Sequence, residues 1–296
     1  MTLAPRAVVV HRRTELDELL DRYGTRGQAE FVLAARGRDL GGLQAAHDAV
    51  TSAVSRVVTD LPPGWRVAQV EREDLPRFLF APEDVVLVVG QDGLVANIAK
   101  YLDGQPVLGV DPQPELHPGV LVTMGPRDVP GRLAALSRGD ADVQCRSMVA
   151  LRADDGQRLL ALNEVYVGHE GHQSSRWTLR VDGREEPQSC SGLIAGTGTG
   201  ASGWCASLWR DRRPGWTLPG PTEAALGWFV REAWPSPVTG TTLTGGVLAA
   251  TQDLQVTVAS DRLVAFGDGV EADRLTLTWG QRVRIGVADT VLRHVR

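Results

Sequence analysis

The chain has 296 residues, of which 43% are hydrophobic and 23% are charged, so its composition is that of a soluble globular protein with two domains or one large one. Its 31 basic and 36 acidic residues give a formal net charge of -5, which argues against a dedicated binder of nucleic acid or of an anionic membrane. Lys100 is the only lysine and no Gly-Lys-Ser/Thr occurs, so a Walker A phosphate loop is excluded.

The three cysteines form no Cys-x-x-Cys pair, which is typical of a chain in a reducing compartment. The first ten residues carry one Arg and a short apolar run, far below the core of a signal peptide. No apolar run approaches the roughly 18 residues needed to span a bilayer. We therefore expect a cytoplasmic protein with no membrane partner and no nucleic-acid partner.

Short apolar runs alternate with helical patterns in the first third of the chain. The predicted strands are residues 7–10, 65–70, 84–89 and 106–110, and the predicted helices are residues 15–23, 40–58 and 94–102. The run Val85 to Val89 is continuous, as in a strand that is buried on both faces of a parallel sheet. Strands that alternate with helices predict a parallel α/β sheet.

The pattern changes after a proline-rich loop at residues 111–119. A helix is predicted at residues 129–137, and mostly strands after it. These strands are residues 144–152, 158–166, 176–181, 193–195, 254–258, 263–266, 275–279 and 283–287. We predict two domains, an α/β nucleotide-binding domain at residues 1–125 and a β-rich domain at residues 126–296, with the chain end able to return to the first domain.

The loop Gly90-Gln91-Asp92-Gly93 follows a predicted buried strand and opens a helix. Parallel sheets bind ligands at the carboxyl ends of their strands, and a helix N-terminus attracts phosphate. A carboxylate would repel an anion, so Asp92 indicates a general base, or a metal contact, that activates a hydroxyl beside the phosphate. The alternative is a plain turn in which Asp92 caps the helix.

A second loop is rich in glycine and threonine, from Gly192 to Gly203. Its last six residues match the Gly-x-Gly-x-x-Gly dinucleotide fingerprint by letter, which raises the alternative of a Rossmann oxidoreductase. The loop lies in β-rich sequence, however, and Pro214-Gly215 cuts short any helix after it. Small residues let a backbone approach a ligand closely, and the alternative is a glycine-rich loop that is packed for steric reasons.

Asn163 and Glu164 interrupt the apolar run at residues 159–167. Two polar residues in a strand-like stretch destabilise the fold if they are buried without partners, so either ligand hydroxyls or backbone groups are expected to satisfy them. His169 and His172 lack the helical spacing of a zinc pair and are interpreted as a solvated turn. Asp268 follows a predicted strand and is interpreted as part of a tight turn.

In this order, these segments resemble the NAD kinases. Gly90-Gln91-Asp92-Gly93 is similar to that family's Gly-Gly-Asp-Gly loop, Asn163-Glu164 to its Asn-Glu/Asp pair, and Gly192 to Gly203 to its glycine- and threonine-rich loop. The match is closest to the mitochondrial-type branch. It rests there on Pro106 to Asp111 with Pro114-Glu115 and Gly119, and on Thr197 to Gly200 with Trp204.

The resemblance implies an N-terminal α/β domain and a C-terminal β-rich domain. It implies transfer of a phosphoryl group from ATP, or from polyphosphate, to the 2'-hydroxyl of the adenosine ribose of NAD, with Mg2+ accompanying ATP and with a homodimer as the assembly. By the same resemblance Asp92 orients or deprotonates that hydroxyl. The other implied nucleotide-binding residues are Gly90, Gly93, Asn163, Glu164, Thr197, Thr199, Gly200 and Ser202.

Three residues depart from the family's pattern. Gln91 replaces the second glycine of the loop, Leu94 replaces the usual threonine, and Ser191 stands where many bacterial members have an aspartate. The first two leave open an alternative, a protein of the same fold that binds NAD or another nucleotide but is catalytically impaired. A lipid kinase is less favoured, because nothing in the second half of the sequence indicates a hydrophobic lipid cleft.

Overall fold

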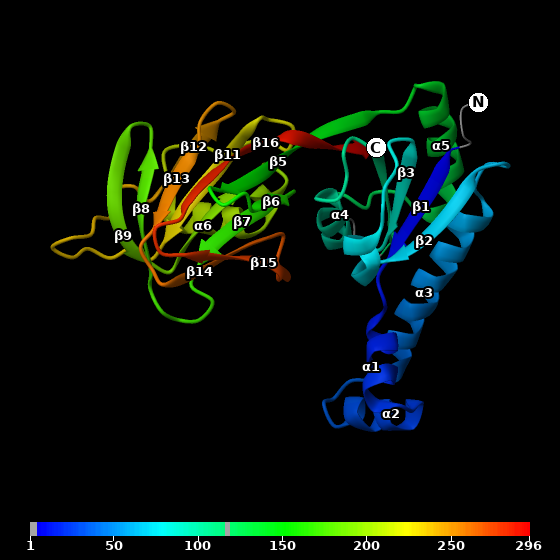
Figure 1. Ribbon diagram of the computed structural model, residues 1–296. Coiled ribbons are helices and arrows are strands. Elements are labelled where there is room, and N and C mark those ends of the chain that lie inside the picture. The colour runs from blue at the N-terminus through cyan, green and yellow to red at the C-terminus, as the bar shows by residue number, and fades with distance from the viewer. Residues whose placement is uncertain (1–4, 116–118) are drawn as a thin grey trace. The chain divides into compact units, whose positions relative to one another are not determined.

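The structure is a computed structural model that describes residues 5–115 and 119–296. It divides into two compact units, Met1–Gln144 with Arg293–Arg296, and Cys145–Leu292 (Figure 1). The first unit extends past the domain boundary that we expected after residue 125, because it includes α5 (Val129–Arg138), which buries Val129 and Leu133 in that unit's core.

The first unit is built on a parallel sheet. Its strand order is β2 (Arg66–Glu71), β1 (Arg6–His11), β3 (Asp84–Val89), β4 (Pro106–Val110) and then the end of β16 (Arg282–Val295). Each neighbouring pair in this order is parallel. All six residues of β3 are buried, as its continuous apolar run predicts for a strand covered on both faces.

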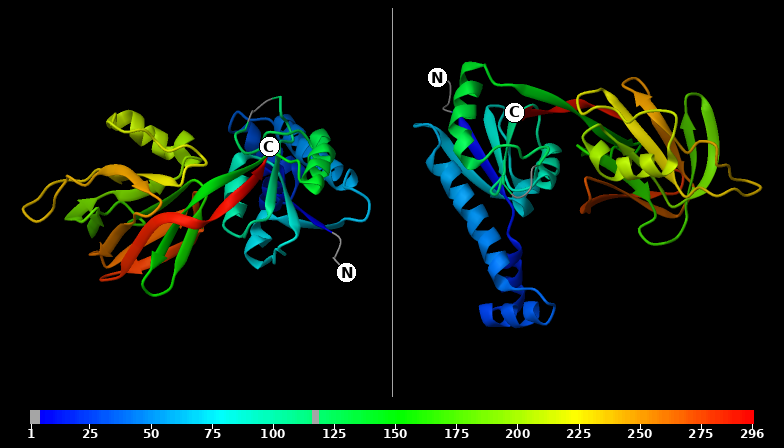
Figure 2. Two further views of the ribbon diagram at one scale, coloured as in Figure 1. Left: turned by 90° about the horizontal axis from the view of Figure 1, so that it is seen from above. Right: turned by 180° about the vertical axis from the view of Figure 1, so that it is seen from behind.

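Helices cover both faces of this sheet. From α3 (Leu40–Thr59), Ala53 and Val57 share one core with Val9 and Leu87 of the strands. Figures 1 and 2 show α4 (Asp92–Ala99) on the opposite side of the sheet from α3 and α5. The α/β architecture predicted for the N-terminal part is therefore confirmed.

Two short helices extend the first unit beyond the sheet. They are α1 (Glu15–Tyr23), which has a capping box at its start, and α2 (Arg26–Ala34). The sequence pattern does not predict α2. Both helices pack against the beginning of α3 in a small cluster of their own, made of Leu16, Leu19, Ala29, Leu33 and Leu40.

The second unit contains two β-sheets. One is a six-stranded antiparallel sheet in the order β12 (Gly245–Ala249), β11 (Ala225–Arg231), β10 (Gly192–Gly196), β7 (Glu164–Gly168), β14 (Arg262–Gly267) and β15 (Val270–Thr278). The other runs in the order β9 (Arg184–Cys190), β8 (Ser175–Val181), β13 (Leu254–Val258) and β16, with β5 (Val143–Ala153) beside β16 and β6 (Arg158–Ala161) beside β5.

The main core of the second unit contains residues of both sheets. Val165 and Leu193 of the six-stranded sheet share it with Trp177 and Val256 of the other sheet. Alternate residues of the six-stranded sheet point to its other face, where Ile194 and Phe229 pack with α6 (Trp204–Arg212). The β-rich character predicted for the C-terminal part is confirmed.

Some elements of the second unit differ from the prediction. The strand expected at residues 158–166 is two strands, β6 and β7, separated by Leu162 and Asn163. The strands β9, β11 and β12 were not predicted. No helix in the described part of the chain is long and apolar enough to cross a membrane.

Candidate functional site

The loop Gly90-Gln91-Asp92-Gly93 lies at the carboxyl end of β3, as the sequence predicts. The backbone N–H of Gly90 donates to the carbonyl of Val110 at 3.0 Å, which ties the loop to the end of β4. Asp92 is the first residue of α4, and Gln91 precedes it as the N-cap. The loop therefore joins the ends of two parallel strands to a helix N-terminus, a place where backbone amides can hold phosphate oxygens.

The Asp92 carboxylate is held by the segment that follows β4. Its Oδ1 accepts the backbone N–H groups of Leu121 and Val122, both at 2.9 Å, and its Oδ2 accepts that of Val120 at 2.8 Å. A carboxylate offers about four lone-pair sites. These bonds use both sites of Oδ1 and one of Oδ2, so Oδ2 keeps one site for a further donor such as a substrate hydroxyl.

The backbone at Gln91 has no need of glycine. Its φ is -110° and its ψ is 163°, an extended conformation that any residue adopts, so the side chain causes no backbone strain. Leu94 is buried, and a Cβ on Gly90 would meet its side chain at 3.3 Å. The two departures from the family's loop pattern are thus accommodated locally, Gln91 by ordinary dihedral angles and Leu94 by packing in the core.

In the second unit, Asn163 and Glu164 lie at the break between β6 and β7. The backbone N–H groups of Leu162 and Asn163 donate to the carboxylate of Asp268, at 2.9 and 2.6 Å. The N–H of Asp268 in turn donates to the carbonyl of Glu164 at 3.0 Å. Backbone and carboxylate groups therefore satisfy the peptide groups at this break, and the Asn163 and Glu164 side chains are not needed for that purpose.

The glycine- and threonine-rich loop folds directly beside this break. The N–H of Thr197 donates to the carbonyl of Asn163 at 2.8 Å, and its hydroxyl donates to the carbonyl of Leu162 at 2.6 Å. The same hydroxyl accepts the N–H groups of Thr199 and Gly200, at 3.1 and 3.4 Å. Thr197 is buried and fully engaged within the protein, so it fixes the loop against the Asn163 segment.

Glycine is required in this loop for close packing. A Cβ on Gly200 would lie 2.5 Å from the carbonyl oxygen of Asn163, and one on Gly198 would lie 2.0 Å from the backbone of Gly220. The loop follows β10, which is antiparallel to both its neighbours, β7 and β11. The Rossmann alternative is therefore excluded, since its fingerprint needs a parallel βαβ unit.

Two further predicted residues of this loop, Thr199 and Ser202, have side-chain contacts of their own. The Ser202 hydroxyl donates to the carbonyl of Thr199 at 3.4 Å. The buried side chain of Arg146, on β5, reaches the hydroxyl of Thr199 with its Nη1 at 3.4 Å. Sequence reasoning missed Arg146, because it lies far from the loop in the chain and forms no motif.

The Glu164 side chain is partly buried, and its surroundings disfavour its charge. Burial, and after it the nearby negative charge of Asp268, raises the pKa of this carboxyl from 4.5 to about 7. Glu164 can therefore exchange a proton near neutral pH. A carboxyl of this kind can hydrogen-bond ligand hydroxyls as an acceptor or as a donor.

The structure thus groups the predicted site residues in two sets. Asn163, Glu164, Thr197, Thr199, Gly200 and Ser202 come together in the second unit, with Asp268 and Arg146 beside them. Gly90, Asp92 and Gly93 lie together in the first unit. Among the described residues no group of His, Cys, Asp and Glu side chains could hold a metal ion, and His169 accepts the N–H of Gly171 within its own turn.

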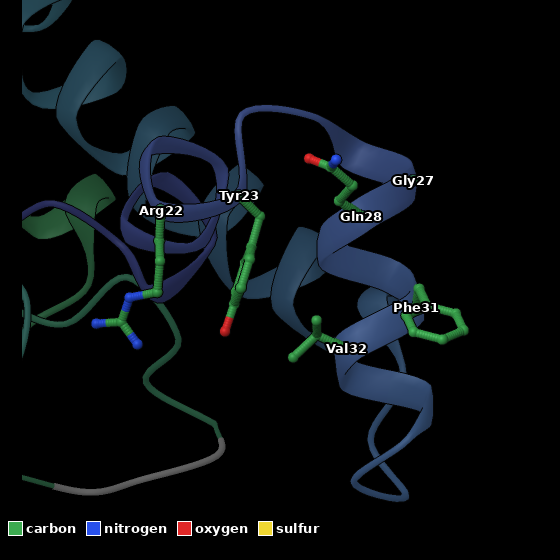
Figure 3. Close-up of a pocket in the computed structure, with 6 residues that line it drawn as sticks. All are labelled: Arg22, Tyr23, Gly27, Gln28, Phe31 and Val32. Atoms are coloured by element: carbon green, nitrogen blue, oxygen red, sulfur yellow. The ribbon is translucent and has the colours of Figure 1, made fainter.

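A pocket of about 460 Å³ lies between α1 and α2 (Figure 3). Tyr23 lies between the two helices, whereas the ring of Phe31 projects outward and is 76% exposed. The lining residues are Arg22, Tyr23, Gly27, Gln28, Phe31 and Val32. None of them belongs to either set of predicted site residues.

No protein-family model matches the chain. Among curated proteins, it is 28% identical over 254 residues to the mitochondrial NAD kinase 2 of Rattus norvegicus, with 69% of this chain and 60% of the relative covered. The human mitochondrial NAD kinase 2 is 27% identical over 254 residues, with coverages of 69% and 58%. The chain therefore spans about 60% of the length of the curated relatives that it matches.

The fold has a counterpart among solved structures. An NAD kinase from Archaeoglobus fulgidus, solved in complex with ATP, superposes with a TM-score of 0.59 and 18% identity, and the match covers 98% of this chain and 93% of that one. At 18% identity the match shows similarity of fold alone, and the matched region includes both units.

These comparisons correct one expectation and confirm another. The cytoplasmic location expected from the sequence is wrong: the matched curated NAD kinases, from Rattus norvegicus, Homo sapiens and Xenopus tropicalis, are all named mitochondrial. The absence of a signal-peptide pattern and the cysteine content were too weak a basis for a location. The predicted resemblance, in contrast, is confirmed by sequence and by fold: this chain is similar in sequence to the NAD kinases of the mitochondrial type and shares its fold with an NAD kinase of known structure.

Proposed function

We propose that this protein is an NAD kinase, which transfers the γ-phosphoryl group of ATP to the 2'-hydroxyl of the adenosine ribose of NAD and so forms NADP. The observation that carries the proposal is the Asp92 carboxylate, which is held by three backbone N–H groups and keeps one lone-pair site on Oδ2. It belongs to a loop of phosphate-binding type, in a fold shared with an NAD kinase.

In the proposed reaction, Oδ2 of Asp92 accepts a hydrogen bond from the 2'-hydroxyl and orients it. The hydroxyl oxygen attacks the γ-phosphorus, the bond from that phosphorus to ADP breaks, and the hydroxyl proton passes to Asp92. The backbone amide of Gly93 holds a phosphate oxygen at the start of α4, and Gly90, whose own N–H is bonded to Val110, lets the phosphate approach the backbone closely. Because phosphoryl transfer depends mainly on positioning and on charge stabilisation, a rigidly held carboxylate is suited to this role.

The second set of residues is proposed to bind NAD. The Asn163 amide and the Glu164 carboxyl offer donors and acceptors to NAD hydroxyls, and neither is used to satisfy the break between β6 and β7. Thr199, Gly200 and Ser202 line the adenine side, with the buried Thr197 supporting them from within the loop. Magnesium enters with ATP, whose phosphates bind it, and a homodimer is proposed as the assembly.

The decisive assay measures NADP formed from NAD and Mg2+ with ATP, and in a second reaction with polyphosphate, as the phosphoryl donor. Asp92→Asn keeps the side chain's shape but weakens its hold on the hydroxyl, so kcat is expected to fall by roughly 10² to 10⁴. Asp39→Asn is the matched control, because Asp39 accepts the N–H of Gly42 at the start of another helix of the same unit, α3.

Pure wild-type protein that forms no NADP with either donor would refute the proposal. The alternative, a catalytically impaired nucleotide-binding protein, rests on Gln91 and Leu94, and the unstrained backbone at Gln91 weakens it. Calorimetry separates the two: NAD binding without ATP binding or NADP formation supports the alternative. Light scattering tests the assembly, and a mass equal to one chain contradicts the homodimer.

A further inference from the structure

We propose that Asp268 is a positioning residue of the NAD site: its carboxylate fixes the peptide groups of Leu162 and Asn163 and thereby holds the Asn163 and Glu164 side chains in place. This inference rests on the proposed function, because it assigns Asp268 to the same site. The sequence pattern explains Asp268 as part of a tight turn and assigns it no role in binding.

Three hydrogen bonds join Asp268 to the break between β6 and β7. Oδ2 and Oδ1 of Asp268 accept the N–H groups of two successive residues, Leu162 at 2.9 Å and Asn163 at 2.6 Å. The backbone N–H of Asp268 donates to the carbonyl of Glu164 at 3.0 Å. Three peptide groups of the segment are thus fixed by one residue that lies about 105 positions further along the chain.

The break makes this carboxylate necessary. Leu162 and Asn163 lie outside both strands, so their N–H groups do not take part in the ladders of β6 or β7. A buried N–H without an acceptor destabilises the structure, and a carboxylate is one of the few groups that can accept two adjacent N–H groups at once. Asp268 therefore allows the chain to leave β6 at Leu162 and Asn163 and to enter β7 at Glu164.

The turn itself does not require aspartate. Asp268 and Gly269 are the two residues between β14 and β15, with φ values of 52° and 68°. Positive φ at both positions is typical of a type I′ hairpin, which accepts Asn-Gly as readily as Asp-Gly. Asparagine would keep the turn but has a single acceptor oxygen, so the two roles of Asp268 can be separated by one substitution.

The chain contains a matched control in another hairpin. Asp182 and Gly183 connect β8 to β9, with φ values of 51° and 73°, so they form a turn with the same pattern of φ values in the same unit. The Asp182 side chain accepts the exposed Nε2 of Gln252 at 2.6 Å and is not bonded to the Asn163 segment. Asp182→Asn therefore makes the same chemical change in a turn of the same kind, away from the proposed site.

The experiment compares wild type, Asp268→Asn and Asp182→Asn by steady-state kinetics, NAD calorimetry and hydrogen exchange. In Asp268→Asn the amide nitrogen faces one of the two N–H groups, so KM and Kd for NAD are expected to rise about tenfold or more. The KM for ATP is expected to stay within about twofold of the wild-type value, because the Asp268 carboxylate bonds the segment proposed to bind NAD. The peptide amides of Leu162 and Asn163 are expected to exchange faster in this variant alone.

A purely structural role predicts a different result. The melting temperature of Asp268→Asn would then fall while KM and Kd for NAD stayed at wild-type values, and that outcome overturns the inference. An equal rise of KM in Asp182→Asn, or complete loss of folding in Asp268→Asn, also overturns it. Failure of the proposed function is distinguishable, because it would appear in the wild-type protein as absence of both NADP formation and NAD binding.

Discussion

Ionisation of Glu164 lowers the free energy of unfolding of the protein, because its surroundings disfavour the charged carboxylate. Burial, and then the charge of Asp268, raise its pKa to about 7 from 4.5. A carboxyl whose folded-state pKa lies above its unfolded value binds its proton more tightly in the folded state. Its contribution to stability is therefore complete below the unfolded pKa and is lost as the pH rises through about 7.

Glu164→Gln is accordingly expected to stabilise the protein at about pH 8 by roughly 2 kcal/mol, less than the full shift implies because the side chain is partly exposed to solvent. At about pH 5 the difference from wild type should be small, since Glu164 is then protonated in the folded state. Thermal melts at both pH values measure this difference, with Glu185→Gln, at an exposed position of β9, as control. A gain of the same size at both pH values would contradict the assigned cause.

The glycines of the threonine-rich loop allow the whole loop to pack against the Asn163 segment. Gly200→Ala would place a Cβ 2.5 Å from the carbonyl oxygen of Asn163, so the loop or the Asn163 segment must move. We expect a loss of stability of about 1 to 3 kcal/mol together with weaker NAD binding. Gly215→Ala is the control, because a Cβ there meets nothing within 4 Å. Equal NAD affinities of the two variants would show that the close approach has no role in binding.

Elements with a strong local pattern were predictable. The helix at residues 15–23 and the strand at residues 106–110 have the predicted bounds, since a capping threonine and a fully apolar run mark them. In contrast, α2 has no acidic first turn and only a short apolar stretch, and β9 contains Pro187 and several charged residues. These segments become regular through packing and strand pairing, which the local sequence does not reveal.

The candidate site was predictable only in part for the same reason. Asp92 and the Asn163-Glu164 pair belong to short motifs, and the position of Asp92 beside a strand end follows from the sequence, whereas the pair was expected within a single strand. The bonds from Asp268 to Leu162 and Asn163 join residues more than 100 positions apart, and no local pattern encodes them. The division of one apolar run into β6 and β7 depends on those bonds, and so it was missed.

At the scale of the whole molecule, the chain passes from the first unit to the second and back. The residues after Leu292 complete the first unit: Arg293 donates to the carbonyl of Gly104 at 3.0 Å, His294 bonds the carbonyl of Leu121 through its Nε2 at 2.7 Å, and Val295 is fully buried. Their strand lies beside β4 in parallel register. Residues 293–296 thus belong to the first unit and pair with its strand β4, although the other strands of that sheet come from the first half of the sequence.

Deletion of residues 293–296 is expected to destabilise the first unit selectively. Two optical probes can report the units separately. Circular dichroism of helices reports mainly the first unit, because α1 to α5 lie in it. Tryptophan fluorescence reports mainly the second unit, because Trp65 is the only one of the eight tryptophans in the first. The midpoint followed by circular dichroism of the helices should fall by several degrees, and the midpoint followed by tryptophan fluorescence should change little. Arg296→Ala, at an exposed position, is the control. Equal shifts of both midpoints would mean that the units unfold as one.

The return of the chain to the first unit also determines when that unit can finish folding in a cell. A ribosome synthesises residues 145–292 before the residues that pair with β4. Throughout that interval the nascent first unit has an unpaired strand edge, the kind of edge on which neighbouring chains aggregate. The half of the protein that leaves the ribosome first is therefore completed last, and it is the half that chaperones must protect for longest.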